Sequence, residues 1–122
     1  MLFFFAVVPT IVVSPNVTGP FTEGDTVALA CTATGRPYPT IQWYKDGVLL
    51  TNESLTTIYN EEVEQNGLFF TTSILEVCSV GADDRGSYSC MASNSAGNDS
   101  FDFDVQVMLG MYACVHTINE QL

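Results

Sequence analysis

The feature that most constrains this chain is a period of two in the apolar residues around two cysteines and the single tryptophan. Every second residue of segment 27–33 is apolar, and Cys31 is one of these residues. Segment 87–93 has the same pattern around Cys90, and Trp43 stands between polar neighbours. Successive side chains of a β-strand point to opposite faces. The pattern therefore predicts three strands whose apolar faces carry both cysteines and the tryptophan.

The rest of the chain is predicted to form β-strands as well. Turn signals recur every 8 to 15 residues, and no helical period persists. Asp46-Gly47 predicts a hairpin turn, because Gly accepts a positive φ. Residues 68–77 and 101–107 predict long strands, and the polar, acidic stretch 51–67 predicts a short strand near Thr56–Tyr59. Short strands separated by regular turns are typical of an all-β sandwich.

A motif before the second cysteine narrows the fold. The run Asp84-Arg-Gly-Ser-Tyr-Ser-Cys90 has the form Asp-x-Gly-x-Tyr-x-Cys, and it follows Cys31 and Trp43 in the chain. Together these residues resemble an immunoglobulin domain. Segments 23–31, 35–47 and 90–97 are similar to the I-set group of that family. The resemblance implies an immunoglobulin-like β-sandwich with I-set Greek-key topology over residues 10–107.

The resemblance also implies how the cysteines pair. In immunoglobulin domains the cysteines of opposite sheets form a disulfide, and the tryptophan packs against it. We therefore expect a Cys31–Cys90 bridge with Trp43 beside it, and a loop of this length contributes about 4 kcal/mol in the chain-entropy model. Cys78 and Cys114 are predicted either to form a second bridge or to leave one thiol free and the other available for pairing between chains.

Three residues of the motif have structural roles in the family. The hydroxyl of Tyr88 is expected to bond to the backbone upstream, as in a tyrosine corner. Gly86 allows a sharp entry into the strand of Cys90. Asp84 is expected to accept bonds in the preceding turn. Many relatives pair this Asp with an Arg, but the corresponding region here has no cation. Asp84 is therefore expected to use backbone donors or Arg85.

Two segments flank the predicted domain. Residues 1–9 are apolar and end at a proline, which leaves open a signal remnant, a linker or a first strand. Residues 108–122 are predicted to be a C-terminal extension. The apolar segments 2–8 and 108–111 suggest a homodimer as one hypothesis.

Composition excludes several classes of function. The 122 residues contain 3 Lys and Arg against 14 Asp and Glu, a formal net charge of −11. A nucleic-acid site requires clustered cations, so we expect no nucleic-acid partner. No apolar run approaches the roughly 20 residues of a membrane span, so direct membrane insertion is not expected.

Enzymatic and metal chemistry are not expected either. The single histidine, His116, lies in the C-terminal extension, so a Ser-His-Asp or Cys-His arrangement has no plausible geometry. No Cys-x-x-Cys spacing indicates zinc. Glu61-Glu62 and Asp83-Asp84 are interpreted as solvated carboxylates in loops. We expect no catalytic residues, no metal site and no cofactor.

The remaining signals concern setting. The sequons at Asn16, Asn52 and Asn98 fall at predicted strand ends or loops, where a glycan fits a secreted protein. With a core disulfide they favour an extracellular adhesion, receptor or matrix protein that acts by protein recognition. The alternative is a structural spacer of a titin-like intracellular muscle protein.

Partner contacts are predicted at two places. Tyr38 stands between prolines in a loop and offers contact area at small entropic cost. Asp102 and Asp104 alternate with apolar residues and are predicted to face solvent, where they protect an edge strand or attract a basic partner. The sequence leaves open whether that partner is another protein or a second copy.

Overall fold

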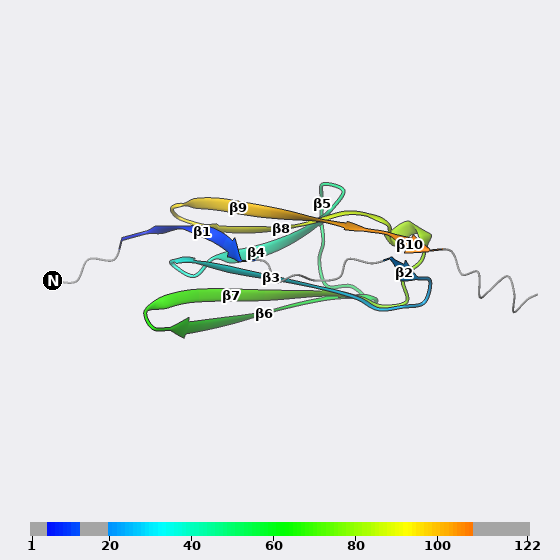
Figure 1. Cartoon of the computed structure of the whole chain (residues 1–122), viewed down its shortest axis with the longest axis horizontal. Coiled ribbons are helices and arrows are strands. Elements are labelled where there is room, and N and C mark those ends of the chain that lie inside the picture. Colours follow the sequence, from blue (N-terminus) through cyan, green and yellow to red (C-terminus); the bar gives the residue numbers. More distant parts are fainter. Residues whose placement is uncertain (1–4, 13–19, 109–122) are drawn as a thin grey trace, which may run out of the picture.

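The computed structural model describes residues 5–12 and 20–108, which form two packed β-sheets (Figure 1). One sheet has the strand order β1-β3-β7-β6 and the other β5-β4-β8-β9. The elements are β1 (Val7–Val12), β2 (Phe21–Thr22), β3 (Val27–Arg36), β4 (Thr40–Lys45), β5 (Val48–Leu49), β6 (Thr56–Gln65), β7 (Leu68–Val77), the 3-10 turn η1 (Ala82–Asp84), β8 (Gly86–Asn94), β9 (Gly97–Val105) and β10 (Val107–Met108). This arrangement confirms the predicted all-β immunoglobulin-like sandwich.

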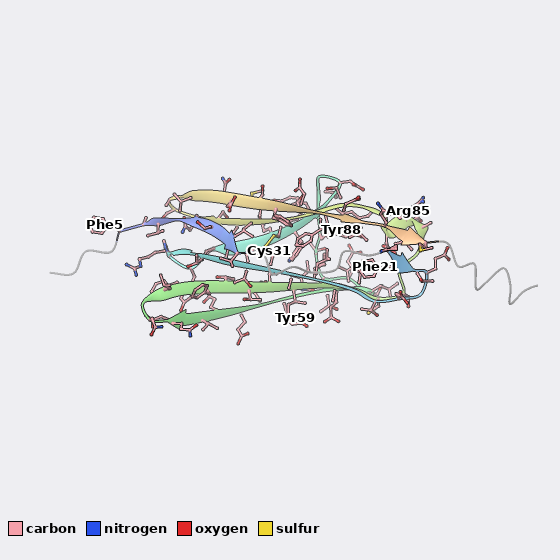
Figure 2. All side chains as sticks on the ribbon, viewed as in Figure 1. Phe5, Phe21, Cys31, Tyr59, Arg85 and Tyr88 are labelled. Atoms are coloured by element: carbon pink, nitrogen blue, oxygen red, sulfur yellow. A yellow bond between two sulfur atoms is a disulfide. The ribbon has the colours of Figure 1, made fainter. Side chains whose placement is uncertain are left out.

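The core lies between the two sheets, as the period of two predicts. Buried residues alternate with more exposed ones along β3 and β8. The Cys31–Cys90 disulfide joins these two strands across the core. Figure 2 shows Cys31 and Tyr88 between the layers. The buried apolar residues are Val27, Leu29, Cys31, Ala33, Ile41, Trp43, Leu75, Val77, Val80, Tyr88, Cys90, Ala92, Phe103, Val105 and Val107.

Trp43 fixes the centre of the core through both packing and a hydrogen bond. Its ring lies 5.8 Å from that of Phe103, measured between centroids. Its indole N–H donates to the hydroxyl of Ser73 over 2.8 Å, and both residues are buried. The bond therefore satisfies two polar groups that burial would otherwise leave unpaired.

The turn before β8 is held by hydrogen bonds to Asp84. The backbone N–H of Gly81 donates to Asp84 Oδ2 over 2.8 Å, and the Tyr88 hydroxyl donates to the Asp84 carbonyl over 2.6 Å. Arg85 does not pair with this carboxylate, because its Nε donates to the carbonyl of Ala82. Burial, and then the negative charges of Asp84 and Asp46, raise the pKa of Tyr88 to about 12.

Gly86 opens β8 with a φ of +149°. A Cβ at this position would lie 2.6 Å from Oδ2 of Asp46. The same Asp46 accepts the backbone N–H of Ser87. The glycine therefore gives the β4–β5 turn close access to the start of β8, as well as conformational freedom.

The strand predicted near Thr56–Tyr59 is longer in the structure, so that boundary was wrong. β6 continues to Gln65 and pairs with β7 along its whole length. Asn66 and Gly67, with φ of 54° and 79°, form the tight turn between the two strands. The same extension places Glu61-Glu62 in a strand, where a loop was predicted.

The first and last strands of the described domain pair with their neighbours in different ways. β1 begins at Val7, inside the segment 1–9, and runs antiparallel to β3. Asn94 donates to the carbonyl of Val7 over 2.8 Å, and Asp99 accepts the N–H of Ile11 over 2.9 Å. β10 pairs in parallel with β2. Within residues 5–12 and 20–108, no helix is long and apolar enough to cross a membrane.

Candidate protein-interaction face

The outer face of sheet β5-β4-β8-β9 presents mixed apolar and acidic side chains. The strand register aligns Leu49, Tyr44, Ser89 and Asp102 in one row across four strands. The adjacent row contains Gln42, Met91 and Ser100. Opposed residues of neighbouring strands share a face. All these side chains therefore point away from the core.

A shallow hollow of about 270 Å³ lies on this face. Its lining residues are Tyr44, Gly47, Ser89, Met91, Ser100 and Asp102. The Ser89 hydroxyl donates to Asp102 Oδ1 over 2.7 Å, and the Tyr44 hydroxyl donates to Gln42 over 3.3 Å. These bonds orient a carboxylate and a phenol beside the hollow, so the face combines an aromatic surface with a fixed negative charge.

Asp102 and Asp104 both lie on the exposed side of β9. Asp104 accepts a long bond, 3.3 Å, from the side chain of Gln106. Asp99 on the same strand differs, because it binds the backbone N–H groups of Ile11 and Ser100. Asp99 therefore holds β1, whereas Asp102 and Asp104 remain accessible to a partner.

Tyr38 lies in the predicted loop between β3 and β4, but its ring does not project freely. It stacks on Phe69 of β7 with 4.6 Å between ring centroids. The guanidinium of Arg36 lies 5.2 Å from the centroid of the same Phe69 ring, and its Nη2 donates to the carbonyl of Gly67. The half-buried tyrosine thus joins the loop to the tip of the β6–β7 hairpin.

All three cations of the chain donate to backbone carbonyls. Arg36 binds Gly67, Lys45 binds Asp83 over 2.7 Å, and Arg85 binds Ala82. Among the described residues one ion pair forms, at 3.6 Å between Lys45 and Asp46. Among the carboxylates of the described residues, Asp46 alone therefore pairs with a Lys or Arg side chain.

The remaining predicted residues have separate positions. Cys78 is exposed just beyond β7. Asn52 and Asn98 are exposed, and Asn52 accepts the N–H of Ile58 over 2.6 Å. Asn16 and Cys114 lie outside the described residues, so a glycan at Asn16 and a Cys78–Cys114 bridge stay predictions.

Other expectations concern metals and self-association. Within residues 5–12 and 20–108, no group of three or more His, Cys, Asp or Glu is placed to hold a metal ion. Of the apolar end segments that suggested a homodimer, Phe5, Val7, Val8 and Met108 are exposed. Residues 2–4 and 109–111 of these segments lie outside the described part of the chain.

Sequence reasoning missed the aromatic and apolar part of the outer face. Tyr44 follows the buried Trp43, so alternation alone assigns it to the opposite face. The same argument assigns Met91 to the outer face beside Cys90. That these side chains line one hollow with Asp102 depends on strand register, which the sequence does not state directly.

Comparison with known protein families agrees with this geometry. A family profile described as "Immunoglobulin domain" matches residues 8–94. The chain belongs to the immunoglobulin family.

Relatives of this immunoglobulin domain occur in proteins of different kinds. Hemicentin-2 of Mus musculus is 38% identical and covers 81% of the chain, which matches 2% of that protein. The titin homolog of Caenorhabditis elegans is 38% identical over 70% of the chain and 0% of its own length. The neural cell adhesion molecule L1-like protein of Mus musculus is 36% identical over 70% of the chain and 6% of its own length. The chain thus spans a small part of each relative.

A solved structure confirms the architecture. Titin domain M7 superimposes with a TM-score of 0.66 at 28% identity, covering 87% of this chain and 99% of that one. The match therefore extends over nearly the whole of one solved immunoglobulin domain.

Proposed function

We propose that this immunoglobulin domain is a protein-recognition module of an extracellular adhesion, receptor or matrix protein. The observation that carries the proposal is the outward-facing row of Leu49, Tyr44, Ser89 and Asp102 on sheet β5-β4-β8-β9, whose two ends are exposed and whose two middle residues are half-buried. Tyrosine is enriched in protein interfaces because it offers a large area at low entropic cost. Asp102 and Asp104 add negative charge that favours a basic partner over an acidic one.

The extracellular setting rests on three separate observations. The core contains a disulfide, which persists in oxidising compartments. Asn52 and Asn98 are exposed within Asn-x-Ser sequons. Hemicentin-2 and the L1-like adhesion molecule are among the relatives. Intact mass of the protein from its native source, with and without reduction and alkylation, tests this setting. Oxidised cysteines with glycan mass support it, and free thiols without glycan overturn it.

A charge-reversal pair tests the binding face. The domain, presented as a tetramer, is applied to an array of cell-surface and matrix ectodomains. Asp102→Lys is expected to weaken any specific signal at least about tenfold, because a rim attraction becomes a repulsion. Glu61→Lys makes the same charge change on β6 of the other sheet and is expected to leave the signal unchanged. Equal losses in both variants would show a dependence on net charge alone and would sink the assignment of the face.

The similarity to the titin homolog of Caenorhabditis elegans supports a second candidate function, that of a structural spacer in an intracellular muscle protein. This function requires end-to-end linkage of domains and no accessory partner on the outer face. Reduced cysteines and unused sequons in the native protein, together with no array signal, are the results expected of a spacer.

A further inference from the structure

β6 is an edge strand whose residues are exposed along most of its length. It spans ten residues and pairs with β7, and it stands last in the sheet order β1-β3-β7-β6. Figure 1 shows β6 on the outer border of its sheet, beyond β7. An edge strand presents unpaired N–H and C=O groups to which another strand can bond. The neighbouring β5, in contrast, has only two residues.

Hydrogen bonding identifies which groups of β6 face outward. The N–H of Ile58 donates to Asn52 Oδ1 over 2.6 Å instead of bonding to β7. In an antiparallel pair the direction of the backbone groups alternates along the strand. The N–H and C=O groups of Asn60, Glu62 and Glu64 therefore point the same way as those of Ile58. Thr56, the first of these outward positions, exchanges backbone hydrogen bonds with Glu53, and the side chain of Asn52 occupies the N–H of Ile58. The next three positions remain available within the described structure.

A hollow of about 300 Å³ lies beside the same edge, between β4, β5 and β6. Its lining contains apolar groups and neutral polar groups, and no charged residue: Ile41, Gln42, Trp43, Leu49, Leu50, Thr51, Asn52, Ile58 and Asn60. β5 pairs with β4 at Tyr44 and Lys45, and the N–H of Leu50 donates to the carbonyl of Trp43, so the part of β4 before Trp43 stays uncovered. The hollow is large enough to receive an aliphatic side chain from a strand laid along β6.

Charge selects the occupant of this edge. Glu62 and Glu64 follow Asn60 on the same face of β6, and both are exposed. The cation at this end, Arg36, stacks on Phe69 and donates to the Gly67 carbonyl without pairing with either glutamate. Opposite charges on directly opposed strand residues stabilise the pair, and like charges destabilise it. A second copy of β6 would bring its own Glu61, Glu62 and Glu64 close to the same three glutamates, so charge disfavours it.

We infer that the β6 edge binds an extended basic segment of another protein by strand addition. The segment places an aliphatic residue in the hollow beside Ile58 and Asn60. It places Lys or Arg opposite Glu62 and Glu64. Because side chains alternate between the two faces of a strand, the recognised sequence has a cationic residue at every second position. This site is separate from the outer face of sheet β5-β4-β8-β9, and it does not depend on the function proposed for that face.

Fluorescence anisotropy with labelled peptides tests the inference on the whole, unglycosylated chain. Asn52 lines the hollow, so the inference requires this sequon to carry no glycan, and the glycan mass expected of an extracellular protein then comes from the other sequons. The probe alternates Lys with Thr and ends in Leu at the position of the hollow. One control peptide replaces Lys with Glu. A second carries N-methyl groups on the backbone nitrogens of its Lys and Thr residues, which removes the N–H donors in either strand direction while keeping the charge. The probe is expected to bind, and both controls are expected to bind at least about tenfold more weakly.

Matched variants locate the site. Glu62→Lys with Glu64→Lys is expected to weaken the probe by about tenfold or more, because two attractions become repulsions. Glu61→Lys lies on the same strand but on its opposite face and is expected to change binding less than threefold. Asp102→Lys tests the other sheet and is expected to have no effect on this probe, so failure here is distinct from failure of the proposed function.

Amide hydrogen exchange decides between strand addition and simple charge attraction. Bound peptide is expected to slow exchange at Asn60, Glu62 and Glu64, whose N–H groups face the edge. Equal binding of the N-methylated peptide, or slowed exchange only at other strands, would overturn the inference. Sedimentation showing dimers that Glu62→Lys abolishes would also overturn it, because the occupant would then be a second copy.

Discussion

β8 and β6 have almost the same length and are stabilised in different ways. β8 has nine residues in the middle of one sheet, and its buried residues alternate regularly. β6 has ten residues at the edge of the other sheet, and apart from the half-buried Thr56 and Ile58 all of them are exposed. β8 is held by core packing, a disulfide and the Tyr88 bond. β6 is held mainly by its ladder to β7 and the tight turn that joins them. A long strand therefore does not require a buried face when a hairpin supplies its register.

The largest difference is expected from removing the disulfide under β8. Replacing both Cys31 and Cys90 with alanine should lower the free energy of unfolding by about 4 kcal/mol, because the unfolded chain regains the entropy of the closed loop. Urea unfolding monitored by tryptophan fluorescence measures this loss. Cys78→Ala, at an exposed position, is the control and should change stability by less than about 0.5 kcal/mol. A loss below about 1 kcal/mol in the double variant would mean that packing alone holds β8.

Tyr88→Phe should cost about 2 kcal/mol at neutral pH. The substitution keeps the ring in the core but removes the donor that satisfies the Asp84 carbonyl, leaving a part-buried acceptor unpaired. Urea unfolding of the two proteins at pH 7 gives the difference. A cost near zero would indicate that water replaces the phenol, and that the turn does not depend on this bond.

The same tyrosine makes stability fall at alkaline pH. Its folded pKa of about 12 lies above the ordinary value of 10.0, so folding favours the neutral phenol. This contribution is complete below pH 10 and is lost as the pH rises from 10 to 12. The free energy of unfolding of the parent should therefore decline over this window more steeply than that of Tyr88→Phe. Parallel declines in the two proteins would contradict the assignment.

Gly67→Ala should weaken β6 and leave β8 intact. The residue has φ +79°, which an alanine adopts only with strain, so we expect a cost of about 1 kcal/mol. Gly81→Ala is a matched control, because Gly81 has negative φ and open space where a Cβ would lie. Amide exchange should accelerate in β6 and not in β8. Uniform acceleration in both strands would show that the hairpin and the core unfold together.

The smallest effect is expected at Tyr59, on the exposed side of β6 (Figure 2). Its hydroxyl donates to Glu76 over 2.8 Å, and this bond raises the pKa of the phenol. Water can replace an exposed bond, so Tyr59→Phe should change stability by less than about 0.5 kcal/mol. Comparing the melting temperatures of Tyr59→Phe and Tyr88→Phe separates an edge phenol from a core phenol. Equal effects would remove the distinction.

The same contrast explains what the sequence could predict. Core strands have one buried face, so residues such as Leu29 and Cys90 display the period of two directly. β6 is mostly exposed on both faces, so its glutamates break the alternation of apolar and polar residues by which a strand is predicted. Asn66-Gly67 is nevertheless a sequence signal for the hairpin turn that follows β6. The stacking of Tyr38 on Phe69 could not be predicted, because it depends on where that hairpin ends. The outer face required strand register, which places Asp102 in the same row as Tyr44, with Ser89 between them.

The use of all three cations as donors to backbone carbonyls has a consequence for the behaviour of the domain in solution. With a formal charge of −11 and few intramolecular ion pairs, two copies repel each other over the range of the Debye length. The second virial coefficient should therefore be strongly positive at low ionic strength and decrease as salt is added. In concentrated solutions of low ionic strength, charge repulsion would keep neighbouring molecules apart. The three cations would still join segments of the same chain through their hydrogen bonds.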